Sequence, residues 1–219
     1  MPPLATGESA EAGPAGSALP DALARPAQEA VARLLAMQPP PRRERLSGIH
    51  NPWGLAAGLT DPWRFLDLCE SAPVADALER VIGPDIVLWD SELYLHARDY
   101  RAFVADGREG RYWPAKPLAG AVALIALGAR PALHVMDVQG LSLPAGFVAD
   151  DAPLYVIRAM PASSTFSRDP NTPANRTAMQ EQLLINYTTR PLWLLRGEDR
   201  AGNDFVTGFA SDPPRWASR

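Results

Sequence analysis

The stretch "DIVLWDSELYLHA", residues 85–97, decides the fold class. Its residues alternate in polarity and include β-branched and aromatic side chains, as in a half-buried β-strand. Further strand-like runs follow, separated by Gly, Pro, Asp and Ser; they cover residues 119–128, 131–138, 152–160 and 179–189. Several short strands with turn residues between them predict an antiparallel sandwich or barrel.

Helices are predicted before this region. Residues 21–37 place apolar side chains at helical spacing, and the prolines at 39–41 end the helix. Residues 61–82 form a second helical stretch that Asp61 caps, that breaks at residues 71–73 and that Gly83 ends. Residues 1–20 are rich in Ala, Gly, Pro and Ser, so we expect a disordered tail followed by one domain over residues 21–219. The fold class is mainly β with N-terminal helices (α+β), a jelly roll closed by helices on one face.

Composition excludes several classes of protein. The net charge of −4 and the lack of a basic stripe argue against binding to nucleic acid or to an anionic membrane surface. Cys69 is the only cysteine and there are three histidines, which excludes a disulfide framework and makes a histidine-rich zinc site improbable. No apolar run approaches the roughly 18 residues of a membrane span, and no secretory signal is found. We therefore expect a cytoplasmic protein.

Three segments carry a resemblance to a known family. They are "VIGPDIVLWDSELYLH" (81–96), "GREGRYWPAKPLAGAVALIAL" (107–127) and "DPNTPANRTAMQEQLLINY" (169–187). In this order and spacing the chain resembles the phytanoyl-CoA dioxygenase family of non-haem Fe(II)/2-oxoglutarate oxygenases. The resemblance implies a double-stranded β-helix, the cupin-like form of a jelly roll.

The resemblance also indicates a degenerate iron site. Family members hold Fe(II) with a His-x-Asp pair and a distal histidine, which leave coordination positions open for the cosubstrate and dioxygen. Here Gly107 and Glu109 stand at the pair, and Phe166 (or Thr165) stands at the distal histidine. We expect no metal and no cofactor, with iron and 2-oxoglutarate as the cofactors if this assignment is wrong. Arg176 and Asn171 are kept, and the family arginine binds 2-oxoglutarate; an ordinary ion pair is the alternative for Arg176.

The strand at residues 88–96 supplies candidate catalytic groups. A period of two places Leu88, Asp90, Glu92, Tyr94 and His96 on one face, which we assign to the interior. Glu109 and Tyr112 are expected across from them. The predicted catalytic residues are Glu109, His96, Asp90 and Tyr112, and the predicted ligand-binding residues are Arg176, Glu92, Trp113 and Asn171. In the alternative phase Trp89, Ser91, Leu93 and Leu95 face inward and the charges lie in water.

Three functional hypotheses follow. The first is a metal-independent, non-redox step such as cyclisation or isomerisation on a small organic molecule in bacterial specialised metabolism. The second is a non-catalytic subunit that binds a ligand or supports an active homologous oxygenase, with a homodimer as a further option. The third is a Fe(II)/2-oxoglutarate dioxygenase with unusual ligands.

Overall fold

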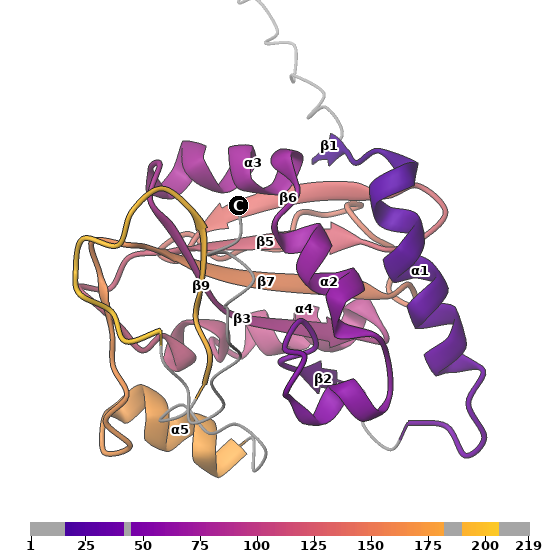
Figure 1. Cartoon of the computed structure of the whole chain (residues 1–219). Coiled ribbons are helices and arrows are strands. Elements are labelled where there is room, and N and C mark those ends of the chain that lie inside the picture. The colour runs from indigo at the N-terminus through magenta and orange to yellow at the C-terminus, as the bar shows by residue number, and fades with distance from the viewer. Residues whose placement is uncertain (1–15, 42–44, 182–189, 206–219) are drawn as a thin grey trace, which may run out of the picture.

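The fold is a mostly antiparallel sheet with helices on both faces, seen in a computed structural model that describes residues 16–41, 45–181 and 190–205 (Figure 1). The α-helices are α1 (Asp21–Leu35), α2 (Pro62–Cys69), α3 (Ala72–Ile82), α4 (Ala97–Ala105) and α5 (Pro173–Glu181). Two 3-10 helices are η1 (Leu55–Gly58) and η2 (Glu109–Tyr112). The strands are β1 (Ser17–Ala18), β2 (Arg45–Ser47), β3 (Ile86–Tyr94), β4 (Ala115–Lys116), β5 (Ala121–Ala126), β6 (Ala132–Asp137), β7 (Leu154–Pro161), β8 (Thr165–Phe166) and β9 (Trp193–Arg196).

The main sheet has the strand order β1-β6-β5-β7-β3-β2, and β9 also pairs with β3. All its pairings are antiparallel, and β4 and β8 form a separate two-stranded ladder. The predicted antiparallel strands at residues 85–97, 119–128, 131–138 and 152–160 are thus confirmed as β3, β5, β6 and β7.

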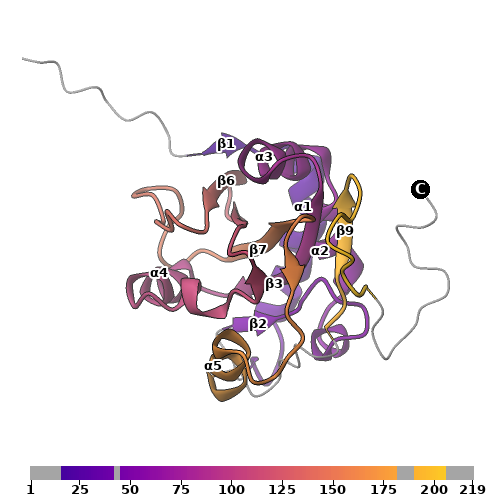
Figure 2. The ribbon, with the colours of Figure 1, turned by 90° about the vertical axis from the view of Figure 1, so that its left-hand side faces the viewer.

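Two apolar cores lie on opposite faces of this sheet. Helices α1, α2 and α3 cover one face, here called the helix face, and pack on alternate residues of β3, β5, β6 and β7. Helix α4 and the β4–β8 ladder cover the other, here called the second face. Figure 2 shows α1–α3 and α4 on opposite sides of the strands. Because both faces are covered, every residue of β3 is buried, as in a strand between two layers.

The N-terminal helices follow the sequence closely. Helix α1 buries Ala24, Ala27, Val31 and Leu34 along one stripe. The Asp61 side chain accepts a hydrogen bond from the Trp63 N–H (3.1 Å), which caps α2 as predicted. The break between α2 and α3 and the end of α3 at Gly83 are also confirmed.

Three segments differ from the prediction. Ser17 and Ala18 form strand β1 on the edge of the sheet, within the segment predicted to be a disordered tail. Residues 179–181, predicted as the start of a strand, belong to helix α5, and residues 182–189 lie outside the described residues. Helix α4 was not predicted. Long-range packing overrides local propensity in such short elements.

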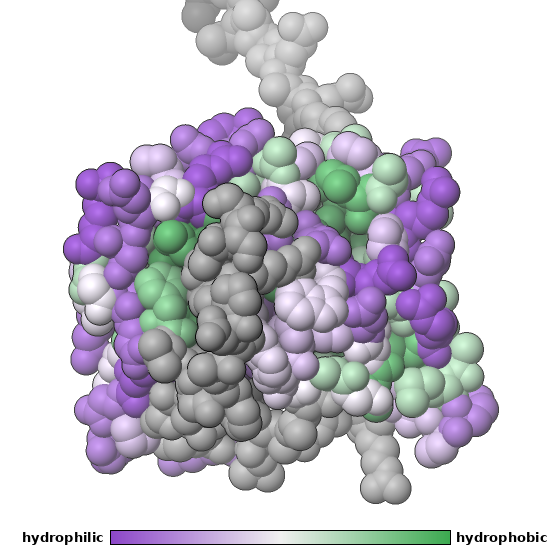
Figure 3. All heavy atoms as spheres, viewed as in Figure 1, coloured by the Kyte–Doolittle hydropathy of each residue, from purple (hydrophilic) through white to green (hydrophobic). Residues whose placement is uncertain are grey.

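The surface is ordinary for a folded chain. On the side shown in Figure 3, hydrophobic residues form separate small patches among hydrophilic ones. Among the described residues, no helix combines the length and the apolar character that a membrane span needs.

Gly120 tests the packing of the second face. A Cβ atom there would lie 2.1 Å from Cζ3 of Trp113 and 2.8 Å from the backbone oxygen of Ala159. We expect Gly120→Ala to lower the free energy of unfolding by more than about 2 kcal/mol, because the buried indole has to move. Gly140→Ala, where a Cβ meets nothing within 4 Å, is the control and should change stability by less than about 0.5 kcal/mol. Urea denaturation measures both, and equal stability of the two variants would contradict this packing.

Candidate functional site: a buried arginine–carboxylate network

A buried arginine lies at the centre of the candidate site. Arg158 is in the middle of β7, where its neighbours across the ladders are Asp90 on β3 and Val122 on β5. Its side chain projects from the second face of the sheet and is 2% exposed. A lone guanidinium at this depth would be strongly unfavourable, so its partners decide whether the fold tolerates it.

Three carboxylates surround the Arg158 guanidinium. Its Nε donates to Oε1 of Glu109 (2.6 Å) and its Nη2 donates to Oε2 of the same carboxylate (2.7 Å), a two-pronged ion pair. Nη1 donates to Oδ2 of Asp90 (3.0 Å), and Nη2 also donates to Oε2 of Glu92 (2.9 Å). One cation thus joins β7, β3 and η2.

Two more arginines balance the remaining negative charge. Arg190 pairs with Oδ1 of Asp90, and the Arg45 Nε lies 3.6 Å from Oε1 of Glu92. The hydroxyls of Ser47 (2.7 Å) and Tyr94 (3.0 Å) donate to the two oxygens of Glu92. Three guanidinium groups therefore face three carboxylates, and we call these six charged residues the ion network: Arg45, Asp90, Glu92, Glu109, Arg158 and Arg190.

The pKa values of the two β3 carboxyl groups of the network are shifted in opposite directions. Burial alone would raise the pKa of Glu92, but Arg158, Arg45 and the Ser47 hydrogen bond outweigh it and lower the pKa to about 2. Burial raises the pKa of Asp90 against the opposing charges of Arg190 and Arg158. Glu92 therefore stays ionised, whereas Asp90 takes up a proton more readily.

A bulge in β3 places these carboxylates. Leu88 pairs with Ala159 and Asp90 pairs with Arg158, so Trp89 is an extra residue in β3. Asp90, Glu92 and Tyr94 lie on the second face as predicted, but Leu88 belongs to the core of the helix face. The expected alternation breaks at Trp89. The alternative phase is wrong in placing the charges in water, because Asp90 and Glu92 are buried. Its inward residues are buried as well, since both faces of the sheet are covered: Trp89, Ser91, Leu93 and Leu95.

Of the other predicted site residues, Glu109 and Trp113 join this region. Glu109 begins η2 and is 1% exposed. Trp113 packs edge-on against Trp89, with ring centroids 5.1 Å apart. Phe166, at the position of the distal histidine, is buried in the same core.

The remaining predicted site residues lie elsewhere. His96 is half-buried just before α4, with its Nδ1 3.2 Å from the Asp151 carbonyl, and no described contact joins it to the network. Arg176 and Asn171 are exposed in and before α5, where Asn171 N–H donates to Asp169 (2.8 Å). The side chain of Tyr112 lies outside what the structure describes. The expected grouping of Glu109 with His96 is therefore corrected.

Sequence reasoning missed the three arginines. Arg158 interrupts the apolar run "LYVIRAM", residues 154–160, two positions from Val156. A buried arginine in such a strand requires buried carboxylates as partners. This signal could have linked Arg158 to Asp90 and Glu92. Arg45 and Arg190 are far in sequence from the carboxylates that they contact, so only the tertiary structure identifies them.

A second buried polar cluster lies on the helix face. The Ser91 hydroxyl is 2.7 Å from Nδ1 of His50 and accepts from the Tyr155 hydroxyl (3.0 Å), which also lies 3.0 Å from Sγ of Cys69. Burial, assisted by the charge of Arg190, lowers the pKa of His50 to about 3, so the imidazole is neutral near pH 7. Burial raises the pKa of the Cys69 thiol to about 12, which keeps it protonated. These groups are buried polar partners within the core.

Comparison with solved structures supports the fold. The structure titled CytC3 matches with a TM-score of 0.52 and 15% identity, over 89% of this chain and 87% of that one. The structure titled CytC3 with Fe(II) and alpha-ketoglutarate matches with a TM-score of 0.51 and 14% identity, over the same shares. At this identity the likeness shows the fold alone. No family model and no curated protein matches the chain.

The residues of this chain do not fit the iron centre that the family resemblance implies. At the positions that the resemblance assigns to the two histidines, Gly107 and Phe166 offer no ligand atoms, and both oxygens of Glu109 accept hydrogen bonds from Arg158. Among the described residues, no group of three His, Cys, Asp or Glu side chains is placed to hold a metal ion.

Arg158→Met tests the network. The substitution leaves three carboxylates buried beside only two guanidinium groups, and we expect the free energy of unfolding to fall by about 3–5 kcal/mol. Arg101→Met, which removes a partly exposed arginine 3.2 Å from Asp150, is the matched control and should cost less than about 1 kcal/mol. Denaturant titration compares the two, and equal losses would contradict a structural role for Arg158.

His50 predicts how stability depends on pH. Its folded-state pKa is lowered to about 3 from 6.5, so its contribution is complete above pH 6.5 and is lost as the pH falls toward 3. Between pH 8 and pH 5 this loss amounts to about 2 kcal/mol. In His50→Asn, whose amide reaches Ser91 but does not titrate, the stability difference between these pH values should shrink by that amount. An unchanged difference in urea unfolding would show that His50 is not buried as a neutral group.

Proposed function

We propose that this chain is a non-redox member of the oxygenase fold, built on a double-stranded β-helix, that acts by binding a small organic ligand or a partner protein. The observation that carries the proposal is the two-pronged ion pair of Arg158 with Glu109, the residue that the family resemblance assigns to the iron-binding carboxylate. A resident guanidinium supplies the positive charge there without open coordination positions, so neither dioxygen nor a 2-oxo acid finds a metal to bind.

The same contacts favour binding over acid–base catalysis at Glu109. A general base needs a lone pair within reach of the substrate proton. Both oxygens of Glu109 already accept hydrogen bonds from Arg158, and Glu92 accepts from Arg158, Ser47 and Tyr94. Both carboxylates are also buried (Glu109 1% and Glu92 0% exposed), which keeps a substrate proton from their remaining lone pairs.

A metal-independent acid–base step is the second candidate, and Asp90 is the observation that favours it. Burial raises the pKa of this carboxyl, which makes it the proton donor of the network. Its two arginine partners, Arg158 and Arg190, are 2% and 9% exposed. In this reading Asp90→Asn removes turnover while the fold, checked by circular dichroism, is kept.

Iron and cosubstrate binding test the proposal directly. We expect the full chain, loaded anaerobically with Fe(II) and desalted, to retain much less than one iron per chain by mass spectrometry. Calorimetric titration with 2-oxoglutarate should give no saturable heat. CytC3 treated in the same way is the positive control. Stoichiometric iron together with 2-oxoglutarate binding would overturn the proposal and identify an oxygenase with unusual ligands.

A further inference from the structure

The strands that the structure describes cover only part of the outer edge of β6. Strand β5 pairs with it along its whole length, but β1 pairs only with Ala132 and Leu133 on the other side. The Leu19 N–H donates to the Pro131 carbonyl (3.0 Å), so odd-numbered residues turn their main chain toward this outer edge. The N–H and C=O of Val135 therefore point outward, and no described strand lies opposite them.

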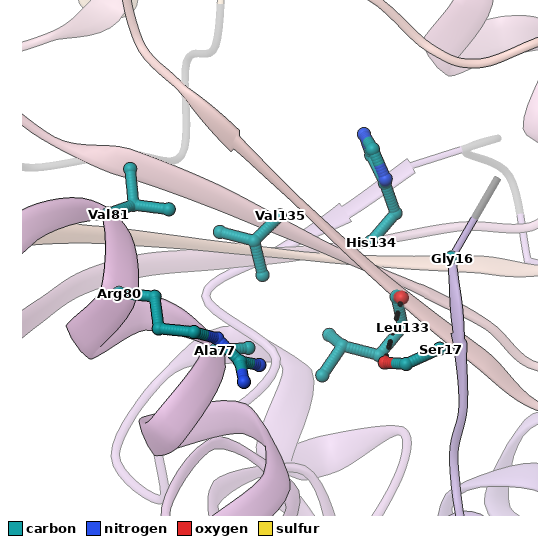
Figure 4. Close-up of a pocket in the computed structure, with 8 residues that line it drawn as sticks. All are labelled: Gly16, Ser17, Ala77, Arg80, Val81, Leu133, His134 and Val135. Atoms are coloured by element: carbon teal, nitrogen blue, oxygen red, sulfur yellow. Dashed lines mark hydrogen bonds between the residues drawn. The ribbon is translucent and has the colours of Figure 1, made fainter.

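A hollow of about 250 Å³ lies at this uncovered edge, beside α3. Figure 4 shows its lining: Gly16, Ser17, Leu133, His134 and Val135 from the sheet edge, and Ala77, Arg80 and Val81 from α3. Leu133 and Val135 pack with the core under α3, whereas His134 points to the other side of the strand (Figure 4), where Phe147 lies 5.7 Å away. An open strand edge flanked by a helix is the geometry that accepts an additional strand.

One cation borders the hollow. On the same helix, Asp76 and Glu79 both pair with Arg196. Arg80 is exposed and has no ion-pair partner among the described residues. The hollow thus combines unpaired main-chain groups, apolar side chains and one positive charge, which together match an extended peptide that carries a carboxylate.

We propose that the edge of β6 at Val135 binds an extended peptide segment of a partner polypeptide, whose carboxylate pairs with Arg80. The inference names the partner class for the proposed function and rests on it.

A second copy of this chain does not fit the edge. Antiparallel pairing of two β6 strands about Val135 would put Asp137 of one copy opposite Leu133 of the other. Ser17 already holds that position through its pairing with Leu133. A second β6 would need the position that Ser17 holds, whereas a short peptide that pairs only from Val135 onward would not.

Affinity selection on the full chain tests this inference, with random hexapeptides that end in a free carboxylate as the probe. We expect an enriched peptide to bind saturably in fluorescence anisotropy, and its C-terminal amide to bind at least fivefold more weakly. Arg80→Glu should weaken binding at least tenfold, whereas Arg33→Glu, an exposed arginine on α1, should leave it unchanged. Val135→Pro removes the outward N–H at an edge position that tolerates proline and should abolish binding.

Hydrogen exchange of the Val135 amide identifies any other occupant. We expect rapid exchange in the free monomer and slow exchange with the enriched peptide. Slow exchange in the free monomer would mean that the chain covers its own edge, and protection that grows with protein concentration would mean a second copy; either result overturns the inference. Absence of any enriched peptide also overturns it. None of these outcomes depends on iron binding, so the peptide-binding inference and the proposed function can fail independently of each other.

Discussion

The ion pair between Arg158 and Glu109 is the contact on which the second face of the sheet depends. It ties η2 to the centre of β7, and the same guanidinium reaches Asp90 and Glu92 on β3. Three buried carboxylates, two on β3 and one on η2, thus share the Arg158 guanidinium. Because each charge is buried, removal of one member leaves the others without compensation, and the cost is much larger than for an exposed pair. This explains how a sheet between two apolar layers tolerates charged residues at its middle.

The network also bears on function. Beside Glu109, a carboxylate in the segment that carries the family resemblance, the chain places the guanidinium of Arg158. A guanidinium holds carboxylates by directed hydrogen bonds and has no vacant positions, whereas Fe(II) has exchangeable ones. The hollow at the edge of β6 is lined by residues that take no part in the ion network.

The sequence by itself determined the order and type of the main elements. The helical spacing in α1, the cap at Asp61 and the stop at Gly83 are local signals, and local physical chemistry is sufficient for them. The alternation in β3, the strand runs of β5, β6 and β7, and the burial of Asp90, Glu92 and Glu109 also followed from the sequence. These features depend on residues within a few positions of one another.

Only the tertiary structure decided which partners meet. The bulge at Trp89 places Leu88 on the helix face. Such a bulge cannot be predicted from the two-residue period of side chains along a strand. His96 lies outside the network, and Arg45, Arg158 and Arg190 enter it, because pairing across strands joins residues up to about a hundred positions apart. The open edge at Val135 depends on where β1 stops along β6. A chain fixes its local conformations through its neighbours in sequence, but the charges and edges that decide function are set by contacts that form only when the sheet closes.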